Sequence, residues 1–364
     1  MLVFVLNAGS SSLKYQLIDI KSKELKASGL VERIGIDGIL KHEIGENKKI
    51  TFELPIPTHK EAIELVLRIL TNDETKVINS IDEIKAIGHR VVHGGEHFKG
   101  SVIVDDEVIR KIEELIPLAP LHNPANILGV KICKDLMPKV PNVVTFDTAF
   151  HQTMPMENFL YAVPYADYTE HHLRKYGFHG TSHYYVSQEA IKLLNKKDSK
   201  VIVCHLGNGS SVCAVKDGKS ISTSMGLTPL EGLVMGTRSG DIDAGVIPYL
   251  MEKKGLNHIQ ILDYLNKKSG ILGVSGVSSD LREVIKAAND GDKRSKIAIT
   301  MLCDRIKKYL CSYAGLMHGV DAICFTAGIG ENSDLIREKV CEGLEFMGIE
   351  IDKDKNSKRE KGNR

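Results

Sequence analysis

Two stretches of the chain share one pattern of apolar and polar residues, and the first lies at the N-terminus. Leu2–Leu6 is a continuous apolar run, which is typical of a strand buried on both faces. A turn follows at Asn7–Ser10, and a second apolar strand continues to Ile20. Gly9 lets the backbone turn sharply or approach a ligand closely. The pattern therefore predicts a β-hairpin.

The tip of this hairpin carries the hydroxyls of Ser10, Ser11 and Ser12, and Lys14 follows them. Backbone N–H groups in a tight turn, together with hydroxyls and a cation, suit a phosphate group. An ordinary hairpin with a polar tip is the alternative interpretation.

The same pattern recurs 200 residues later, in Val201–Val215. There an apolar strand leads into a Gly/Asn turn, and Gly209-Ser210-Ser211 matches Gly9-Ser10-Ser11. Two copies so far apart predict two related lobes, each offering one hairpin to a shared ligand. A nucleoside triphosphate is the simplest such ligand.

The rest of the first half alternates between strand and helix patterns. Asn142–Phe146 reads as a strand that delivers Asp147 at its C-terminal end, where parallel sheets bind ligands. Asn123 and Pro124 predict a helix cap and a first helical position. We expect antiparallel strands over Ser28–Leu54, helices over Lys60–Leu70, Asp105–Leu115 and Pro124–Leu136, and a strand over Ile84–Val92.

The second half is mostly helical, apart from one long polar segment and one buried-type strand. Ser224–Gly245 is rich in Gly, Ser, Thr and charge without a sustained period, and a loop of this length is usually functional. Ala322–Phe325 reads as a buried strand leading into a Gly-rich turn, Thr326–Asn332, as in nucleotide sites. We expect helices over Ser182–Leu194, Ala244–Lys253, Ile259–Lys268, Leu281–Asn289, Arg294–Met317 and Asp334–Phe346, and a solvated tail over Asp352–Lys361.

Composition sets the class of protein. A chain of 364 residues favours two domains, which we place at residues 1–149 and 150–364. The formal net charge of +1 gives no general attraction to nucleic acid or to an anionic membrane. Seven scattered cysteines without Cys-x-x-Cys spacing favour a reducing cytosol. We expect no signal peptide and no membrane span, and hence a cytoplasmic protein.

Two arginines and a histidine are the candidates for chemistry. Arg90 ends a predicted strand, and Arg238 is flanked by glycines in the long loop. Arginine captures a carboxylate or phosphate with two parallel hydrogen bonds, although a surface arginine is the more common case. His179 lies among small residues that leave space for a ligand, with a structural histidine as the alternative. His89, His93 and His97 recur every four residues, a spacing that makes zinc a minor alternative.

An ordered set of motifs resembles the acetate kinase family. The two most diagnostic segments are Asn7–Lys14 and Gly177–His183. The matches run in the family's order from residue 2 to about residue 350. The other matching segments are Gly88–Gly95, Leu121–Pro124, Phe146–Phe150, His205–Gly209, Met235–Asp241 and Gly328–Asn332.

The resemblance implies a two-lobed, actin-like (ribonuclease H-like) α/β fold with a cleft between the lobes, and a homodimer. It implies an enzyme that transfers a phosphoryl group reversibly from ATP to acetate, giving acetyl phosphate and ADP, with magnesium or manganese. One alternative is a kinase of the same family that acts on propionate or another short-chain acid. The other, from a different class, is an actin-like ATPase module without a small-molecule acceptor.

The resemblance also implies roles for individual residues. It places Asn7 near the magnesium-bound phosphates, Lys14 near ATP and Arg90 on the acyl substrate. Asp147 would orient the metal or the substrate, while His179 and Arg238 would stabilise the transferring phosphoryl group. The small acyl pocket would be lined by Val92, His122 and Pro229, and the nucleotide bound by His205, Leu206, Gly207, Asn208, Gly209, Asp280, Leu281, Arg282, Gly328, Ile329, Gly330, Glu331 and Asn332.

One departure from the family's pattern concerns the C-terminus. Family members continue with a further strand and helix that carry a glutamate helping to hold magnesium. This sequence reaches Arg364 without a counterpart of that glutamate.

Overall fold

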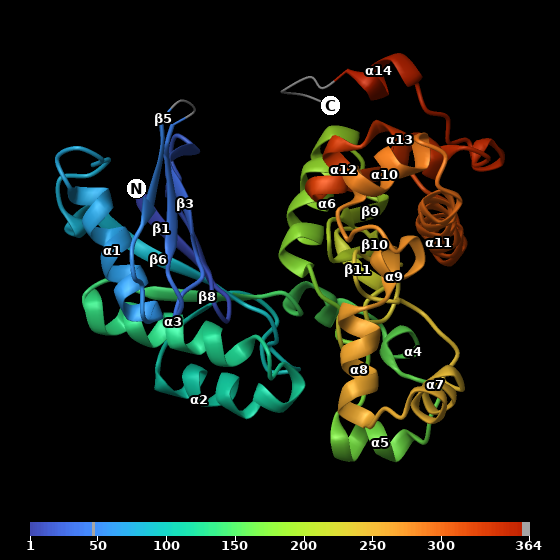
Figure 1. Cartoon of the computed structure of the whole chain (residues 1–364), viewed down its shortest axis with the longest axis horizontal. Coiled ribbons are helices and arrows are strands. Elements are labelled where there is room, and N and C mark those ends of the chain that lie inside the picture. Colours follow the sequence, from blue (N-terminus) through green and yellow to red (C-terminus); the bar gives the residue numbers. More distant parts are fainter. Residues whose placement is uncertain (46–47, 359–364) are drawn as a thin grey trace. The chain divides into compact units, whose positions relative to one another are not determined.

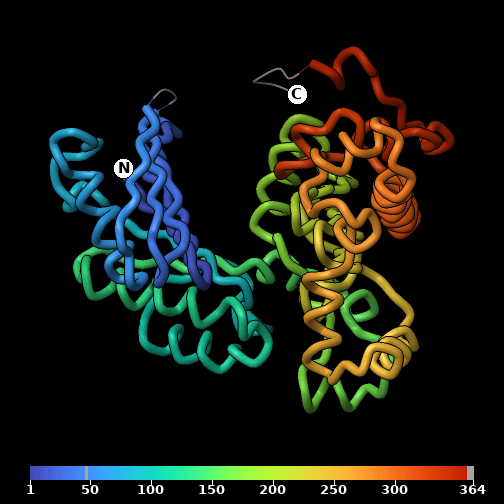
Figure 2. The backbone as a smooth tube through the Cα atoms, viewed as in Figure 1, coloured from blue at the N-terminus to red at the C-terminus, as the bar shows by residue number. Residues whose placement is uncertain are grey.

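The computed structural model describes residues 1–45 and 48–358. The chain forms two compact units, Met1–Ala149 and Phe150–Arg364. Figure 1 labels most elements of each unit, and Figure 2 traces the backbone. Among the described residues, no helix has the length and apolar character needed to cross a membrane.

The first unit combines one mixed sheet with helices. Its strands run in the order β5-β4-β3-β2-β1-β6-β8-β7. The strands are β1 (Leu2–Ala8), β2 (Leu13–Asp19), β3 (Glu24–Glu32), β4 (Ile39–Ile44), β5 (Lys48–Glu53), β6 (Ile84–Val91), β7 (Val102–Ile103) and β8 (Asn142–Phe146), and the helices are α1 (His59–Thr71), α2 (Asp106–Glu114) and α3 (Asn123–Leu136).

The predicted N-terminal hairpin is confirmed. β1 pairs with β2 in antiparallel register and with β6 in parallel register. Phe4 and Leu6 lie in a core that also includes residues of α1 and α3. Val3 and Val5 alternate with them and are only half-buried, so the prediction of a strand buried on both faces is wrong. The reason is that Val5 lines a cavity on the opposite face of the sheet.

The second unit contains a smaller sheet, in the order β11-β10-β9-β12, with more helices around it. The strands are β9 (Lys200–Leu206), β10 (Ser210–Lys216), β11 (Lys219–Thr223) and β12 (Ala322–Thr326). The helices are α4 (Met156–Phe159), α5 (Tyr165–His171), α6 (Gly180–Leu194), α7 (Val246–Lys254), α8 (His258–Lys267), α9 (Gly270–Ser275), α10 (Leu281–Asn289), α11 (Lys293–Met317), α12 (Ala327–Asn332), α13 (Asp334–Cys341) and α14 (Lys353–Ser357).

The second hairpin repeats the first. β9 pairs with β10 in antiparallel register and with β12 in parallel register, as β1 does with β2 and β6. Val201–Cys204 is fully buried, because one face packs in a core with α11 and the other packs against α6. β12 is half-buried rather than buried as predicted, since it is the edge strand of this sheet.

Four local predictions are wrong. Asn123 does not cap α3, because its side-chain amide bonds to the backbone N–H and C=O of His93. The Gly-rich turn after β12 is the helix α12, and α13 ends at Cys341. Part of the predicted tail is the short helix α14, where Arg337 donates to Asn356. Residues 359–361 of that prediction lie outside the described residues.

Candidate functional site

Strand register brings three of the predicted residues together in the first unit. Asn7 lies opposite Lys14 across the β1–β2 pair. The parallel pairing of β1 with β6 sets Leu6 beside His89, so Asn7 lies next to Arg90. Asn7, Lys14 and Arg90 line one cavity of about 550 Å³. A neutral amide and two cations on one surface can receive an anionic ligand.

Arg90 forms an ion pair with Asp147 that the sequence did not reveal. Its Nε donates to Oδ1 over 2.8 Å, and its Nη2 donates to Oδ2 over 2.5 Å. Asp147 is 2% exposed, and its charge raises the pKa of the Arg90 guanidinium. The buried carboxylate thus fixes one edge of the guanidinium and leaves the Nη1 edge for a ligand. The pair has no net charge.

The other predicted residues of the first unit have different environments. Val92 is buried, and its backbone N–H donates to Asn126 Oδ1. His122 is exposed at the start of α3. The zinc alternative finds no support: His89 contacts Asn142 over 2.7 Å, and burial lowers the pKa of His89 to about 4. Among the described residues, no cluster of three or more His, Cys, Asp or Glu could hold a metal ion.

Arg238 and His179, the two candidate residues of the second unit, both lie near Gly209 at the tip of the second hairpin. A Cβ built on Gly209 would lie 3.5 Å from Arg238 Nη1 and 3.7 Å from His179 Nε2. His179 stacks on His205 with ring centroids 4.1 Å apart. His179 therefore reaches the hairpin tip beside Arg238, as a residue that acts on a ligand there would.

The hydroxyls of this hairpin are used within the protein. Ser210 Oγ donates to the carbonyl of Gly207 over 2.8 Å. Ser211 Oγ is fully buried and lies 2.8 Å from His179 Nδ1 and 2.7 Å from His183 Nε2. Sequence reasoning missed both Ser211 and His183 as partners of His179. Since neighbouring strand residues face opposite sides of a sheet, it could have placed one of the two serines inward.

The long loop is irregular, as predicted, and many contacts hold it in place. The Asp241 carboxylate accepts from the Gly232 N–H over 2.7 Å and from Tyr309 Oη over 2.8 Å. The N–H of Ile271, in α9, donates to the Met235 carbonyl over 2.8 Å. Gly270, at φ +61°, is close enough that any Cβ would overlap this carbonyl. These contacts fix the backbone next to Arg238.

Arg238 has neutral partners. Its Nη1 donates to the Pro229 carbonyl over 3.1 Å and lies 3.9 Å from Met235 Sδ. Burial lowers the pKa of the guanidinium. No carboxylate pairs with Arg238 within residues 1–45 and 48–358. A half-buried cation without a counter-ion favours the binding of an anion.

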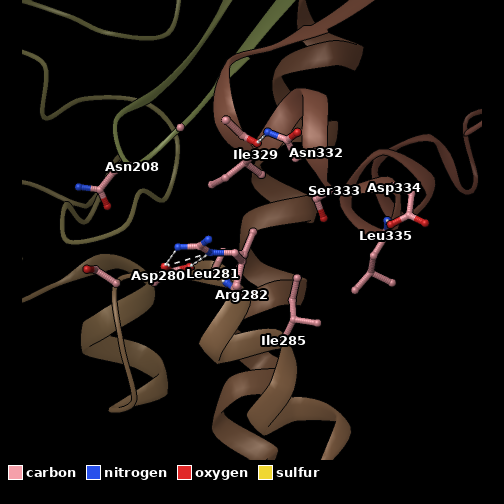
Figure 3. Close-up of a pocket in the computed structure, with 13 residues that line it drawn as sticks. Asn208, Asp280, Leu281, Arg282, Ile285, Ile329, Asn332, Ser333, Asp334 and Leu335 are labelled. Carbon is pink, nitrogen blue, oxygen red and sulfur yellow. Dashed lines mark hydrogen bonds and ion pairs between the residues drawn. The ribbon is translucent and has the colours of Figure 1, made fainter. Parts of the chain in front are cut away.

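Beside the hairpin tip lies a cavity of about 1010 Å³, large enough for a nucleotide. Figure 3 shows its side chains, which come from the hairpin, α10, α12 and the start of α13. Asp280 accepts from the backbone N–H of Arg282 and pairs with its guanidinium, and this lowers the pKa of Asp280 to about 2. The lining combines apolar side chains, such as Leu281 and Ile285, with polar ones, such as Asn208 and Asp280, as a base and a ribose would require.

The cavity contains part of the predicted nucleotide set. The residues of that set that line it are Gly207, Asn208, Asp280, Leu281, Arg282, Gly328, Ile329 and Asn332. Those that do not are His205, Leu206, Gly209, Gly330 and Glu331. Glu331 instead accepts from the N–H of Ala327, at the start of its own helix. The sequence missed Ser279, Ile285, Ser333, Asp334 and Leu335. Of these, Ile285 could have been found, because it lies one helical turn after Leu281.

Comparison with known proteins places these features in a family. Residues 2–364 match the Acetokinase family. The acetate kinase of Treponema denticola is 56% identical over 364 residues, covering 99% of this chain and 92% of that protein. The crystal structure of Porphyromonas gingivalis acetate kinase superposes with a TM-score of 0.94 at 50% identity, covering 98% of this chain and 90% of that one. A propionate kinase from Francisella tularensis superposes with a TM-score of 0.92 at 44% identity, covering 98% and 91%.

Proposed function

The chain belongs to the acetokinase family, and from that membership we propose that it transfers the γ-phosphoryl group of ATP to acetate. Membership confirms the expected resemblance and the actin-like α/β fold class. The products would be acetyl phosphate and ADP, and the reaction would be reversible. We further propose that the two units are the two lobes of this fold.

One observation carries the proposal most directly. Arg238, without a carboxylate partner among the described residues, and His179 converge on Gly209 at the hairpin tip. The same hairpin supplies Gly207 and Asn208 to the nucleotide-sized cavity. A phosphoryl group extending from that cavity would meet a cation and a ring nitrogen. Fixed donors of this kind stabilise the charge that spreads over the equatorial oxygens in phosphoryl transfer.

The acceptor needs no base to become a nucleophile. Carboxyl pKa values lie near ~4, so acetate is ionised at neutral pH. The barrier is electrostatic, because two unit charges of like sign ~4 Å apart repel by about 4 kcal/mol at intermediate dielectric. The Arg90–Asp147 pair is neutral overall, so Arg90 would orient the acetate carboxylate more than it would offset its charge. Arg238 would supply most of the protein's positive charge at the reacting group, and Asp147 would orient Arg90.

The nucleotide roles follow the lining of the cavity. We propose that the adenine lies against Leu281 and Ile285, with Asp280 and Arg282 near the ribose. Gly328, Ile329 and Asn332 of α12 would complete the lining around the nucleotide. Lys14 would contact the phosphates from the first unit.

The residues present fit a magnesium ion that is held mainly by nucleotide phosphates and water. Magnesium prefers oxygen ligands and usually keeps several waters. Asn7 offers a neutral side-chain oxygen beside Lys14 and Arg90, and no larger metal-ligating cluster exists among the described residues. Asn7 would hold the ion, and Asp147 would act through Arg90, to which both of its carboxylate oxygens are bonded. When bound, the ion would neutralise part of the charge on the phosphates.

The acyl substrate remains open between acetate and a slightly longer acid. Val92, His122 and Pro229 are proposed to line the acyl pocket. The likeness to a propionate kinase supports the longer acid as the second candidate. One methylene changes binding in an apolar pocket by only about 1–3 kcal/mol, so one enzyme of this family could accept both. The homodimer and the cytoplasmic location also stay predictions.

The direct test traps the acyl phosphate. Purified protein with magnesium, ATP and acetate should give acetyl hydroxamate when hydroxylamine is present, because hydroxylamine captures an activated acyl group. Propionate and butyrate, assayed in parallel, rank the acceptors. ATP turnover that does not depend on any of the three acids, without hydroxamate, would favour the ATPase module instead.

Replacing Arg90 should affect acetate binding selectively. Arg90→Ala should raise the KM for acetate about tenfold or more, since a hydrogen bond to a charged group contributes about 1.5–3 kcal/mol. It would also leave Asp147 buried without a partner, which destabilises the fold. The double variant Arg90→Gln/Asp147→Asn removes both charges, so it should raise the KM for acetate as well, but without leaving an unpaired buried carboxylate. A KM for ATP that rises while the KM for acetate stays constant would show the assignment to be wrong.

A further inference from the structure

Ser211 connects two histidines inside the second unit. Its Oγ lies 2.8 Å from His179 Nδ1 and 2.7 Å from His183 Nε2, and the serine is fully buried. A hydroxyl carries one proton and two lone pairs, so it can donate to only one of the two rings. If it accepted from both rings, its own buried O–H would lack an acceptor among the described residues, so Ser211 donates to one ring and accepts from the other. The direction of these two bonds decides which nitrogen of His179 carries a proton.

His183 sets this direction. The ring is fully buried in α6, and its Nδ1 has no hydrogen-bond partner among the described groups. Burial, and then the neighbouring His151, His179 and His205, lower the pKa of His183 well below its usual range, so the ring is neutral with one N–H. A proton on Nδ1 would be a buried donor without an acceptor, which is rarer than an acceptor without a donor. The proton therefore belongs on Nε2, which donates to Ser211.

We propose that His183 and Ser211 hold His179 in the tautomer with its proton on Nε2, so that His179 donates an N–H to the transferring phosphoryl group. Ser211, having accepted from His183, donates to His179 Nδ1, and this leaves Nε2 as the protonated nitrogen. Nε2 is the atom that reaches Gly209 beside Arg238. The inference rests on the phosphoryl transfer proposed above and makes Ser211 and His183 positioning residues for it.

The opposite tautomer would work against the reaction. A neutral His179 protonated on Nδ1 would turn the lone pair of Nε2 toward a negatively charged oxygen. In the proposed arrangement a neutral ring donates without having to gain a second proton. Three titratable or charged groups face this pair of rings. His151 lies edge-on to His183, His205 stacks on His179, and Arg238 lies at the hairpin tip.

Kinetics of serine variants test this His183–Ser211–His179 chain of hydrogen bonds, which we call the relay. Ser211→Ala should lower kcat about tenfold or more with KM values for ATP and acetate changed less than about twofold, because only a transition-state contact is misdirected. Ser211→Thr keeps the hydroxyl and should retain most of kcat. Ser220→Ala is the matched control, because Ser220 is equally buried and its Oγ lies 2.8 Å from His151 Nδ1, outside the relay. A kcat of Ser211→Ala equal to that of Ser220→Ala would overturn the proposal.

The tautomer can also be observed directly. Nitrogen-15 NMR of the imidazole rings in the intact protein, with signals assigned from His179→Gln and His183→Gln, should show His179 protonated on Nε2. In Ser211→Ala, His179 should instead be a mixture of the two tautomers. His179 protonated on Nδ1 in the unmodified protein would overturn the relay even if hydroxamate forms normally. Conversely, a protein that forms no hydroxamate but has His179 protonated on Nε2 would retain the relay and reject the proposed reaction.

Discussion

Arg238→Ala should lower kcat about 10²–10³-fold, a loss of roughly 3–4 kcal/mol of transition-state stabilisation. The guanidinium has the carbonyl of Pro229 as a partner and no carboxylate among the described residues, so its charge is available to an anion. That charge matters most when the phosphoryl oxygens gain negative charge. The KM values for ATP and acetate should change far less than kcat.

Arg238→Lys should recover little of this activity. Lysine keeps the charge but loses the planar guanidinium, whose Nη1 donates to the Pro229 carbonyl and lies beside Gly209 and whose other N–H groups could bind the phosphoryl oxygens. Arg294→Lys is the matched control, since Arg294 also donates to backbone carbonyls, at Val274 and Gly273, on the same unit. Steady-state kinetics on folded preparations should show normal kcat for the control. Arg238→Lys with kcat within about twofold of the unmodified protein would remove the fork from the mechanism.

The parts of the site that follow from local periodicity could be predicted from the sequence. Both hairpins could be predicted as apolar strands around a glycine turn, because strand burial and turn conformation depend on residues that are neighbours in the sequence. The same holds for Asp147, which follows a short buried strand. The irregular loop that carries Arg238 was also visible, from its lack of any period.

Pairings between distant residues could not be predicted in this way. The ion pair of Arg90 with Asp147 joins residues 57 positions apart, and only the parallel pairing of β6 with β8 brings them together. Asn123 looked like a helix cap because its local context allows one. Its amide is instead used by His93, 30 residues earlier, and such competition between partners is invisible in one sequence.

The serines of the second hairpin show how a correct motif can be given an incorrect physical role. Ser210 and Ser211 looked like phosphate ligands because the motif has hydroxyls at a turn. β10 begins at Ser210, so the two side chains face opposite sides, and neither hydroxyl is left to a ligand in this structure. The backbone of Gly207–Gly209 reaches the cavity and the neighbouring Arg238. Any phosphate bound at this hairpin would therefore be held by the turn itself and by His179 and Arg238.

Loss of His179 should lower kcat about as much as loss of Arg238. In addition, the stability of the variant should depend on which residue replaces His179. His179→Ala should lower kcat about 10²–10³-fold, as for loss of one preorganised donor, with smaller changes in both KM values. His179 lies at φ +56°, where alanine is strained by about 1–2 kcal/mol and glycine is not. His179→Gly should therefore be as inactive as His179→Ala but melt at a higher temperature.

This pair of variants separates catalysis from folding. If His179 only packs the turn before α6, through its contacts with Ser211 and His205, then activity per folded molecule should stay near normal in both variants while both melt earlier. Kinetics and a melting curve on the same preparation distinguish the cases. Both variants remove the ring nitrogen near Gly209. If His179 stabilises the transition state, the two variants should therefore lose kcat equally, whatever their melting temperatures. Near-normal kcat in His179→Gly would exclude His179 from the mechanism, and with it the purpose proposed for Ser211 and His183.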